Sequence, residues 1–516
     1  MMNTLSLYGS HDAGAVFVDY TGKLKILEYE RFVQKRYAMY SDMFDSREKD
    51  LGTNQKSREM FIDYIVSQIA NPNNLNIVYA GLSETDIEYL KLRFPNSTFK
   101  MCGHHISHAA SGFFTSNYDE AIIFSVDGGG VDNGMVAFTK VFKGSGKNIE
   151  LLETPDINLG VAYGRIGCPI SEIKPGPDSN LDSLVYAGKV MGLCAYGNVR
   201  EDWVEAVEEY YSHYDLNILG NAIGLNLEFN KLEGQNSYDL AATSQHVFES
   251  ILWRVISKYV EENNNFILVG GCALNVLFNQ RLKAYFNTVN KNLYVPSNPN
   301  DCGLALGQYL LDNPDSKPSV YSGFDILDRD EKLDRINRDI KTSQVVDMLK
   351  QGKILGMVEG NSEVGPRALG NRSIICDPSF ENMKDILNSK VKFREWFRPF
   401  APVCRLEDKD KYFDLVYESE YMSYAPFLKE EFHDKLKSIC HADGTARLQT
   451  VTREQHKTFY DILTELDNRG EIPVILNTSF NIKGKPILTT IKDALYCLDN
   501  TEMDNVIVEG KLYERK

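Results

Sequence analysis

The chain carries the same strand–turn–strand pattern twice, and this repeat constrains the fold more than any other feature of the sequence. The first copy covers residues 5–18 and turns at Gly9-Ser10-His11-Asp12-Ala13-Gly14. The second copy covers residues 121–142 and turns at Asp127-Gly128-Gly129-Gly130. Short apolar runs bounded by glycine-rich turns are typical of buried strands. The repeat therefore predicts a duplicated α/β unit, with one copy near the start of each half.

Glycine-rich turns of this kind can bind the phosphates of a nucleotide. Successive backbone N–H groups in such a turn can cradle a phosphate, although the same residues also form plain hairpin tips. The same two interpretations, a nucleotide contact or a plain turn, apply to Gly270-Gly271-Cys272-Ala273-Leu274-Asn275. This segment follows an apolar strand expected over 266–269 and precedes a helix expected to reach Phe286. The missing side chains would let a base or phosphate approach the backbone. A tight βα turn needs the same residues, so both interpretations stay open.

The composition changes between residues 312 and 343. Residues 312–318 are rich in turn formers, and residues 328–339 are densely charged. A new pattern of helix and strand begins at Ile340, with a helix expected over 343–351 and a strand over 354–358. We read the turn-rich, charged stretch as a linker. The predicted domains are residues 1–335 and 336–516.

Three of the nine histidines fall within five residues, at 104, 105 and 108. His104 and His108 would share one face of a helix, a spacing at which two imidazoles can chelate a metal ion. Asp127 follows at the end of a strand, where its carboxylate could join them. A histidine pair on a helix is otherwise a common structural feature. Two imidazoles with carboxylates suit iron, zinc or manganese, and the ligands alone do not choose among these metals.

The C-terminal part gathers arginines in loops rich in glycine and proline. Arg367 and Arg372 share one loop, Arg394 and Arg398 share a second, and Arg447 lies in a third. A guanidinium binds phosphate or carboxylate through two parallel hydrogen bonds. Arginines held beside proline and glycine are typical of fixed anion clamps rather than of solvated surfaces. In an acidic chain they predict an anionic substrate.

The charge balance excludes a dominant surface for nucleic acid or an acidic membrane. The chain has 56 Lys and Arg against 72 Asp and Glu, a net charge of -16, whereas such partners are bound through basic surfaces. No apolar run approaches the length of a membrane span, and the first residues lack the pattern of a secretory signal. The nine cysteines are scattered without a CxxC pair. We therefore expect reduced thiols and a cytoplasmic protein.

Taken in order, these motifs resemble those of the ATP-dependent O-carbamoyltransferases of the nodulation-factor, cephem and aminoglycoside-antibiotic type. The resemblance extends over nearly the whole chain. Its most specific part is GPRALGNRS at 365–373 followed by NTSFN at 477–481. The other matching segments are His11-Asp12, Glu30-Arg31-Phe32, HHISHAASGFF at 104–114, SVDGGG at 125–130, Gly188–Leu193, GGCALN at 270–275, FRPFAP at 397–402 and HADGTAR at 441–447.

The resemblance implies a fold and a two-step reaction. The fold would be α/β, with a duplicated actin-like (ASKHA) domain followed by a YrdC-like α/β domain. The C-terminal domain would use carbamoyl phosphate and ATP to form carbamoyl adenylate, and the N-terminal domain would pass the carbamoyl group to a hydroxyl of an acceptor. Such an adenylate must be shielded from water during transfer.

The resemblance also assigns roles to individual residues. His11 would be the general base on the acceptor hydroxyl, and Arg36 would face the acceptor. A metal that binds the nucleotide phosphates, with Fe2+ implied and Zn2+, Mn2+ or Mg2+ as other candidates, would be held by His104, His108, Asp127 and Asp301. The nucleotide would contact Asp127, Gly128, Gly129, Gly270, Gly271 and Asn275. Carbamoyl phosphate would be held by Arg367, Arg398, Arg447, Asn477 and Ser479.

Three positions depart from the family's usual pattern. Ala187 stands where a glutamate usually precedes Gly-Lys, and Gly484-Lys485-Pro486 stands where Gly-Glu-Pro is usual after NTSFN. After Glu-Arg-Phe, Gln34-Lys35-Arg36-Tyr37 stands where Arg-x-Lys-His is common. The first and third lie in the region expected to face the acceptor. They therefore bear on the identity of the acceptor rather than on the carbamoyl chemistry.

The acceptor itself stays open. A sugar or antibiotic-type small molecule is the commonest class in the family, and phage members act on hydroxymethylated pyrimidines, as nucleotides or within DNA. We expect no membrane partner, and a homodimer is allowed. The rival functions are a tRNA threonylcarbamoyl-type or other carbamoylating enzyme and a non-enzymatic actin-like nucleotide-binding scaffold. The missing CxxC pairs disfavour a hydrogenase-maturation protein, and the clustered arginines disfavour a scaffold.

Overall fold

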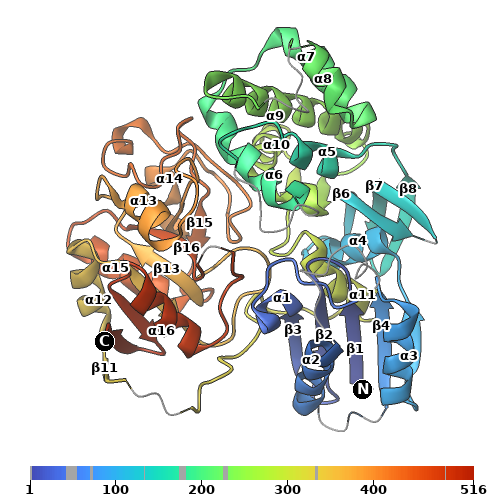
Figure 1. Cartoon of the computed structure of the whole chain (residues 1–516), viewed down its shortest axis with the longest axis horizontal. Helices are drawn as coiled ribbons and strands as arrows, with labels where there is room; N and C mark the ends of the chain where they lie inside the picture. Colours follow the sequence, from blue (N-terminus) through green and yellow to red (C-terminus); the bar gives the residue numbers. More distant parts are fainter. Residues whose placement is uncertain are drawn as a thin grey trace. The chain divides into compact units, whose positions relative to one another are not determined.

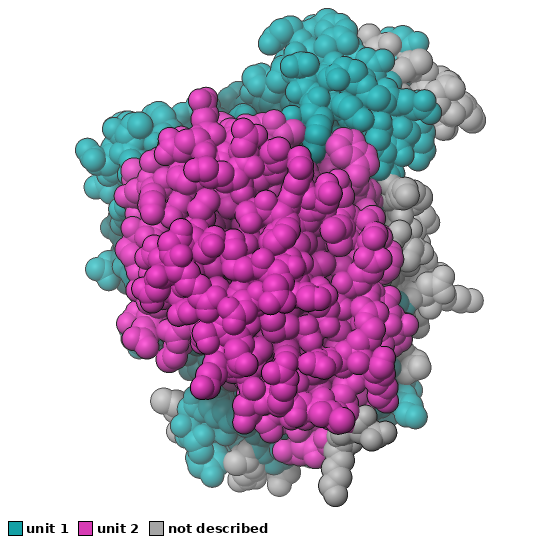
Figure 2. All heavy atoms as spheres, turned by 90° about the vertical axis from the view of Figure 1, so that its left-hand side faces the viewer, with its two compact units in different colours: residues 1–319 teal, residues 320–516 magenta. Residues whose placement is uncertain are grey.

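The computed structural model describes residues 3–41, 55–69, 72, 74–132, 134–173, 182–222, 224, 231–331, 335–482 and 484–516. The chain divides into two compact units, Met1–Ser319 and Val320–Lys516, which Figure 2 colours separately. The boundary expected after residue 335 lies inside the second unit. The charged stretch before it is tied to that unit, since the carboxylate of Asp328 accepts hydrogen bonds from the backbone N–H groups of Ile491 and Lys492.

The first sheet of unit 1 has five strands in the order β3-β2-β1-β4-β5 (Figure 1). β1 pairs antiparallel with β2, and β2 with β3, so this part of the sheet is a meander that contains the predicted first turn. β1 also pairs parallel with β4, and β4 with β5. The strands are β1 (Asn3–Tyr8), β2 (Gly14–Val18), β3 (Leu24–Glu28), β4 (Leu75–Ala80) and β5 (Thr98–Met101).

The second sheet repeats this topology strand for strand, in the order β10-β9-β6-β7-β8. β6 pairs antiparallel with β7, and β7 with β8, while β6 pairs parallel with β9, and β9 with β10. Because both the order and the sense of pairing recur, the predicted duplicated unit is confirmed. The second predicted turn is wrong, because residues 127–130 lie within β6, where the pairing shifts between Val126 and Gly130 and the strand continues to Asp132. The strands are β6 (Glu120–Asp132), β7 (Met135–Ser145), β8 (Asn148–Glu153), β9 (Asn265–Val269) and β10 (Asn292–Tyr294).

Two helices that pack against each other link the two sheets of unit 1. α4 (His104–Thr115) packs on the second sheet, α11 (Leu304–Asp312) packs on the first, and the two helices pack on each other. Small residues permit the close approach, because a Cβ atom at Gly307 would overlap the carbonyl oxygen of Ser107. On its other side, a Cβ at Gly112 would lie 2.7 Å from the side chains of Ile267 and Val269. This packing brings the first turns of α4 next to the start of α11.

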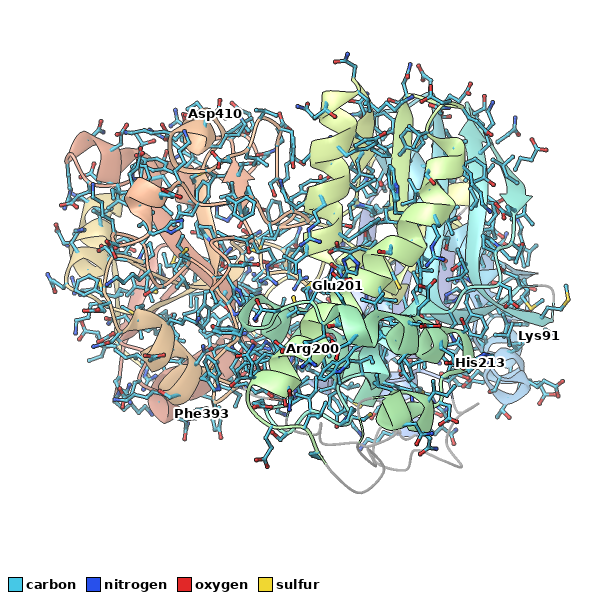
Figure 3. All side chains as sticks on the ribbon, turned by 90° about the horizontal axis from the view of Figure 1, so that it is seen from above. Lys91, Arg200, Glu201, His213, Phe393 and Asp410 are labelled. Atoms are coloured by element: carbon cyan, nitrogen blue, oxygen red, sulfur yellow. The ribbon has the colours of Figure 1, made fainter. Side chains whose placement is uncertain are left out.

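Further helices complete unit 1. The apolar spacing over 240–260 predicts a helix, and α9 (Gln235–Ile256) covers most of that range. α10 (Val276–Thr288) begins directly after the GGCALN segment, as predicted. Figure 3 labels both ends of α7 (Glu201–His213). The other helices are α1 (Tyr29–Val33), α2 (Gln55–Gln68), α3 (Glu84–Arg93), α5 (Leu159–Arg165), α6 (Asp182–Leu193) and α8 (Leu216–Ala222).

Unit 2 contains one mixed sheet of eight strands, in the order β11-β18-β17-β12-β13-β16-β14-β15. The strands are β11 (Asn337–Asp339), β12 (Leu355–Val358), β13 (Arg372–Cys376), β14 (Ala401–Arg405), β15 (Gln449–Val451), β16 (Val474–Ser479), β17 (Asn505–Val508) and β18 (Lys511–Glu514). The helices are α12 (Thr342–Lys350), α13 (Met383–Ile386), α14 (Lys409–Tyr412), α15 (Lys457–Asn468) and α16 (Ile491–Asn500).

Both faces of this sheet are covered by apolar side chains. Side chains alternate between the two faces of a strand, and along β12 Leu355 and Met357 join one core while Val358 joins the other. The first core also contains residues of α12 and α15, and the second contains residues of α16. Burial on both sides explains why β12 is apolar along its whole length.

The predicted fold class, an α/β protein with a duplicated first domain and a second α/β domain, is confirmed. The nine cysteines are all free thiols. Among the described residues, no helix is both long and apolar enough to cross a membrane.

Candidate functional site

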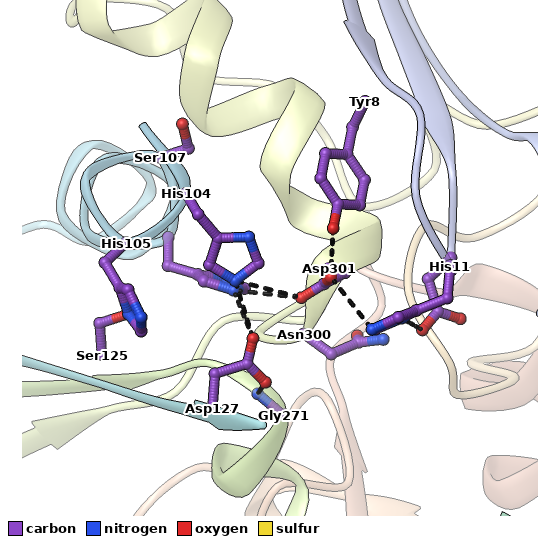
Figure 4. A network of polar contacts seen from close by, with 12 residues as sticks. Tyr8, His11, His104, His105, Ser107, Ser125, Asp127, Gly271, Asn300 and Asp301 are labelled. Atoms are coloured by element: carbon purple, nitrogen blue, oxygen red, sulfur yellow. Dashed lines mark hydrogen bonds and ion pairs between the residues drawn. The ribbon is translucent and has the colours of Figure 1, made fainter. Parts of the chain in front are cut away.

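Four side chains from three segments converge on one buried point in unit 1 (Figure 4). His104 and His108 come from the first turns of α4, Asp127 comes from β6, and Asp301 comes from the 3-10 turn that precedes α11. One nitrogen or oxygen atom of each lies within 4.8 Å of those of the others. The structure thus brings together all four residues expected to hold a metal.

The distances and the donor types fit one divalent ion. His104 Nε2 lies 2.8 Å from Asp127 Oδ2 and 3.8 Å from Asp301 Oδ1, and His108 Nε2 lies 3.4 and 3.3 Å from the same two oxygens. An ion about 2.0–2.2 Å from each ligand requires donors spaced in this way. Two carboxylates beside neutral imidazoles supply two negative charges. This mixed nitrogen and oxygen set suits iron, manganese or zinc better than Mg2+, which prefers oxygen ligands.

The electrostatics of the four residues favour a positive charge between the carboxylates. Burial alone would raise the pKa of Asp127, but hydrogen bonds from His104 and His108 hold that pKa well below its usual range. Burial alone would lower the pKa of His108, but Asp127 and Asp301 raise it to about 9. A cation placed among these groups is therefore stabilised by the same carboxylates.

The third histidine of the cluster has a structural role. Ser125 Oγ donates a hydrogen bond to His105 Nδ1 at 2.8 Å, and His105 Nε2–H donates to the carbonyl oxygen of Ala137 at 2.9 Å. Burial, and then the neighbouring His104, lower the pKa of His105 to about 4. His105 is therefore a neutral side chain that ties α4 to β6 and β7.

Backbone and side-chain donors orient the two carboxylates. The N–H of Gly271 donates to Asp127 Oδ1 at 2.9 Å, and the hydroxyl of Tyr8 donates to Asp301 Oδ2 at 2.6 Å. Each carboxylate thereby keeps its other oxygen on the side of the histidines. A Cβ at Gly130 would overlap the ring of His104, so this glycine of β6 leaves room for the His104 side chain.

His11 lies in the first turn, beside this centre. Its Nε2 is 3.6 Å from Asp301 Oδ2 and its Nδ1 is 3.2 Å from Asp12 Oδ2, and 26% of the side chain is exposed. Burial would lower the pKa of His11, but Asp301 and Asp12 raise it to about 10. Asp12 holds the turn with a φ of 54°, a conformation that aspartate tolerates better than most residues. The half-exposed ring is thus fixed within reach of the buried carboxylate.

Five of the six residues expected to contact a nucleotide lie in two adjoining segments, the irregular part of β6 and the turn after β9. Gly270 has a φ of 91°, and a Cβ there would overlap the carbonyl oxygen of Val126. This close approach, with the hydrogen bond from Gly271 to Asp127, joins the turn after β9 to the irregular part of β6 that contains Gly128 and Gly129. A nucleotide contact stays a prediction for these residues.

Asn275 is placed differently. Its Oδ1 accepts a hydrogen bond from the N–H of Phe278 and caps α10, and its side-chain amide exchanges hydrogen bonds with Gln245 at 2.9 and 3.0 Å. These contacts occupy the side chain within the protein. The structure therefore supplies a structural role for Asn275.

Unit 2 contains a cluster of four arginines. Burial, and then the neighbouring Arg398, lower the pKa of Arg367 to about 10. Burial and Arg398 likewise hold the pKa of Arg394 well below its usual value. The pKa of Arg447 is lowered by burial and by the other three guanidinium groups. Half-buried cations that repel one another create a site for an anion.

Buried polar atoms adjoin this cluster. Arg447 Nε has no hydrogen-bond partner among the described residues. On β16, Asn477 Nδ2 donates to the carbonyl oxygen of Ala368 at 3.0 Å and to Gln449 Oε1 at 2.9 Å, while its buried Oδ1 has no partner in the described part of the chain. Asn477 is thus fixed directly beside the loop of Arg367.

Ser479 ends β16 in a second polar network. Its Oγ donates to Asn481 Oδ1 at 2.7 Å, and the ammonium group of Lys392 donates to its carbonyl oxygen at 2.7 Å. The same ammonium group also donates to the carbonyl oxygen of Asn481 at 2.9 Å. A buried lysine therefore accompanies the predicted Ser479.

Arg36 lies near the first turn, where Tyr37, Glu30 and Asp12 raise its pKa. It is exposed, and its guanidinium group lies over the ring of Tyr37, 4.8 Å from the ring centre. The N–H of Tyr37 donates to Glu30 Oε2 at 2.9 Å. Arg36 therefore presents a charge at the surface of unit 1, where an acceptor contact stays a prediction.

Comparison with known proteins decides the family. Residues 52–310 match the model described as Carbamoyltransferase N-terminus, and residues 346–515 match Carbamoyltransferase C-terminus. The chain belongs to the carbamoyltransferase family. It is 31% identical to nodulation protein NolO of Bradyrhizobium diazoefficiens, over 80% of this chain and 78% of that protein. It is 28% identical to nodulation protein U of Rhizobium tropici, over 81% and 76% of the two chains.

The predicted resemblance to O-carbamoyltransferases of the nodulation type is thereby confirmed, and the chain is a carbamoyl-transferring enzyme. A solved structure of full-length HypF, in a phosphate- and nucleotide-bound form, aligns with a TM-score of 0.38 at 14% identity, over 60% of this chain and 55% of that chain. That likeness is too remote to inform the site of this carbamoyltransferase.

Two site residues, Lys392 and Tyr8, were not singled out from the sequence, and Arg394 was named there only as one of the loop arginines. Arg394 lies four residues before Arg398 within the quoted arginine loop, so its motif was visible but its role was not. Lys392 precedes that loop and carried no pattern of its own. Tyr8 ends a buried strand and looked like an ordinary core residue, because only the tertiary fold brings Asp301 to it.

Proposed function

We propose that this carbamoyltransferase joins carbamoyl phosphate and ATP chemistry in unit 2 to acceptor carbamoylation in unit 1. Water would release phosphate from carbamoyl phosphate and leave carbamate. A carbamate oxygen would then attack the α-phosphorus of ATP, forming carbamoyl adenylate and releasing pyrophosphate. An acceptor hydroxyl would finally take the carbamoyl group, with AMP as the leaving group.

The arginine cluster of unit 2 is the observation that carries this proposal. The four half-buried arginines are Arg367, Arg394, Arg398 and Arg447. Burial and Arg398 lower the pKa of Arg367 and of Arg394, and burial with all three neighbours lowers the pKa of Arg447. Carbamoyl phosphate and ATP bring several negative charges together, and converging guanidinium groups offset such charge best. Asn477, whose buried Oδ1 has no partner among the described residues, adds an acceptor for an amide N–H of the carbamoyl group.

In unit 1, His104, His108, Asp127 and Asp301 would hold the metal. Fe2+ is the first candidate, Zn2+ and Mn2+ fit the same donors, and Mg2+ fits them less well. A divalent ion there would supply positive charge for the phosphates of a nucleotide. The irregular part of β6 with Gly128 and Gly129, and the turn with Gly270 and Gly271, adjoin these ligands and would offer backbone N–H groups to the same phosphates.

His11 would accept the proton of the acceptor hydroxyl once a divalent cation held by Asp301 offsets the carboxylate charge that otherwise raises the pKa of the ring. It is the half-exposed imidazole next to the metal ligands, and an alcohol is a poor nucleophile until a base takes its proton. Asp12 and Asp301 flank the ring, so they would stabilise the imidazolium that forms. Arg36 would lie toward the acceptor. A sugar, an antibiotic-type molecule or a hydroxymethylated pyrimidine would suit as acceptor.

The test is pyrophosphate release that depends on both carbamoyl phosphate and ATP. We expect Arg367→Ala, Arg398→Ala and Arg447→Ala each to lower this rate about a hundredfold or more, because each removes a charge-assisted contact. Arg338→Ala is the matched control, since Arg338 is an exposed arginine of the same unit. Unchanged rates in all three cluster variants would refute the role of unit 2. Mass spectrometry of hydroxylated sugars and nucleotides, for the gain of one carbamoyl group, would identify the acceptor.

A further inference from the structure

The two carboxylates of the metal centre are held in unlike ways. Asp127 is oriented by a backbone N–H group, that of Gly271, which every substitution except proline retains. Asp301 is oriented by a side chain, since the hydroxyl of Tyr8 donates to its Oδ2 at 2.6 Å. The orientation of Asp301 therefore depends on the identity of one residue on β1.

The two oxygens of Asp301 face different groups (Figure 4). Oδ1 lies 3.3 Å from His108 Nε2 and 3.8 Å from His104 Nε2. Oδ2 lies beside Tyr8 and is 3.6 Å from His11 Nε2. Of these two contacts on Oδ2, the one from Tyr8 is shorter and wholly buried.

Tyr8 is itself firmly placed. Its side chain is 5% exposed, at the end of β1, and its ring meets the ring of His104 edge-on with centres 6.1 Å apart. Its hydroxyl points at the carboxylate of Asp301, and a phenol O–H beside a carboxylate oxygen is the donor. The same side chain therefore contacts one metal ligand by a hydrogen bond and a second by ring packing.

We propose that Tyr8 is a positioning residue of the metal centre, which turns Asp301 so that Oδ1 alone faces the two histidines. This inference rests on the proposed metal at His104, His108, Asp127 and Asp301. Partners of this kind, which orient a ligand without touching the metal, commonly change metal affinity about 10- to 100-fold when removed. Without the Tyr8 hydroxyl, the Asp301 carboxylate is free to rotate, and both of its oxygens become available on the side of the histidines.

The experiment measures Co2+ binding to the full chain by titration and by visible absorption. We expect Tyr8→Phe to weaken Co2+ binding about 10- to 100-fold and to change the shape of the Co2+ absorption band. Tyr40→Phe is the matched control, because Tyr40 is 2% exposed and its buried hydroxyl has no partner in the described part of the chain. The control should bind Co2+ as the unaltered protein does, with the same spectrum.

The outcomes separate this inference from the proposed function. If the unaltered protein binds no Co2+, the proposed metal centre fails and the role of Tyr8 fails with it. If the unaltered protein binds Co2+ and Tyr8→Phe binds it equally well with the same spectrum, only the role of Tyr8 is overturned. Thermal unfolding of the metal-free proteins checks that Tyr8→Phe is folded. If it is not, Tyr8→Met removes the same donor with a more adaptable side chain, and the same two readouts decide.

Discussion

Arg447 lies beside three other guanidinium groups in a half-buried position, and its Nε has no hydrogen-bond partner among the described residues. Like charges at close range repel, and partial burial weakens the screening by water. The folded state therefore carries a local electrostatic cost at this residue. The same feature prepares the site for an anion, because an incoming phosphate meets the Arg447 Nε–H donor and offsets the repulsion among the four guanidinium groups.

We predict that Arg447→Met stabilises unit 2 and abolishes its use of carbamoyl phosphate. Methionine is a flexible side chain that fills the space of the aliphatic stem without the charge. The free energy of unfolding in low salt should rise by about 1 kcal/mol or more, which is typical of relieving an unpaired buried charge. The melting temperature should rise with it. Thermal unfolding in the absence of phosphate measures this effect.

A ligand titration provides the control for this prediction. Inorganic phosphate should raise the melting temperature of the unaltered protein more than that of Arg447→Met, because a ligand stabilises the state that binds it. Arg338→Met, at an exposed arginine, should leave both the melting temperature and the phosphate response near those of the unaltered protein. A lower melting temperature for Arg447→Met in the absence of anion would contradict the proposed repulsion.

At the scale of the elements, the loop that contains Arg367 contacts the N-terminus of α15. The Oε1 of Glu363 accepts a hydrogen bond from the N–H of Leu369 within the loop. His456 caps α15, since its Nδ1 accepts from the N–H of Phe459 at 3.1 Å, and its Nε2–H donates to Asn371 Oδ1 at 3.1 Å. Gly370 has a φ of 132°, and a Cβ there would overlap the His456 ring. The His456 side chain thus caps α15 and also contacts Gly370 and Asn371 at the end of the loop.

We predict that this contact makes unit 2 less stable in mild acid. Burial lowers the pKa of His456 to about 4, from about 6.5 in an unfolded chain. Between these values the unfolded state binds more protons than the folded state, so stability is complete above pH 6.5 and falls as the pH drops toward 4. The loss attributable to this one group is at most about 3 kcal/mol.

Urea unfolding across this pH range provides the measurement. His456→Asn keeps a good helix cap and removes the titrating ring. The variant should therefore lose less stability than the unaltered protein between about pH 6.5 and pH 4. Parallel pH profiles for the two proteins would show that another group governs the acid response.

The elements were largely predictable, whereas the contacts that complete the site were not. Apolar runs and glycine turns marked β1, β6, β9 and α10 because these patterns are local. His104, His108 and Asp127 could be grouped because they lie close in the sequence, and Asp301 came only from the family resemblance. Tyr8 and Lys392 carry no local pattern. Tyr8 on β1 contacts Asp301, and Lys392 contacts Ser479 on β16. These residues are far apart in the sequence, so only the tertiary fold brings each pair together.

At the scale of the whole molecule, the chain consists of two units that each have their own sheets and core. The metal ligands and His11 belong to unit 1, and the four arginines belong to unit 2. The proposed reaction divides in the same way, with adenylate formation assigned to one unit and acceptor carbamoylation to the other. Substitutions in the two units should therefore affect different half-reactions, and this expectation can be tested within one set of assays.

We predict that His11→Asn impairs acceptor carbamoylation about a hundred- to ten-thousandfold, the usual contribution of a general base, and spares adenylate formation. Asparagine keeps a polar side chain of similar reach but cannot take a proton at neutral pH. The paired measurement is pyrophosphate release without acceptor and carbamoylated product with acceptor. Arg447→Ala is the complementary variant, because blocking the first half-reaction should stop both signals. If His11→Asn lowers both signals together, His11 supports folding or nucleotide binding instead. If it lowers neither, another group takes the proton or its removal does not limit the rate.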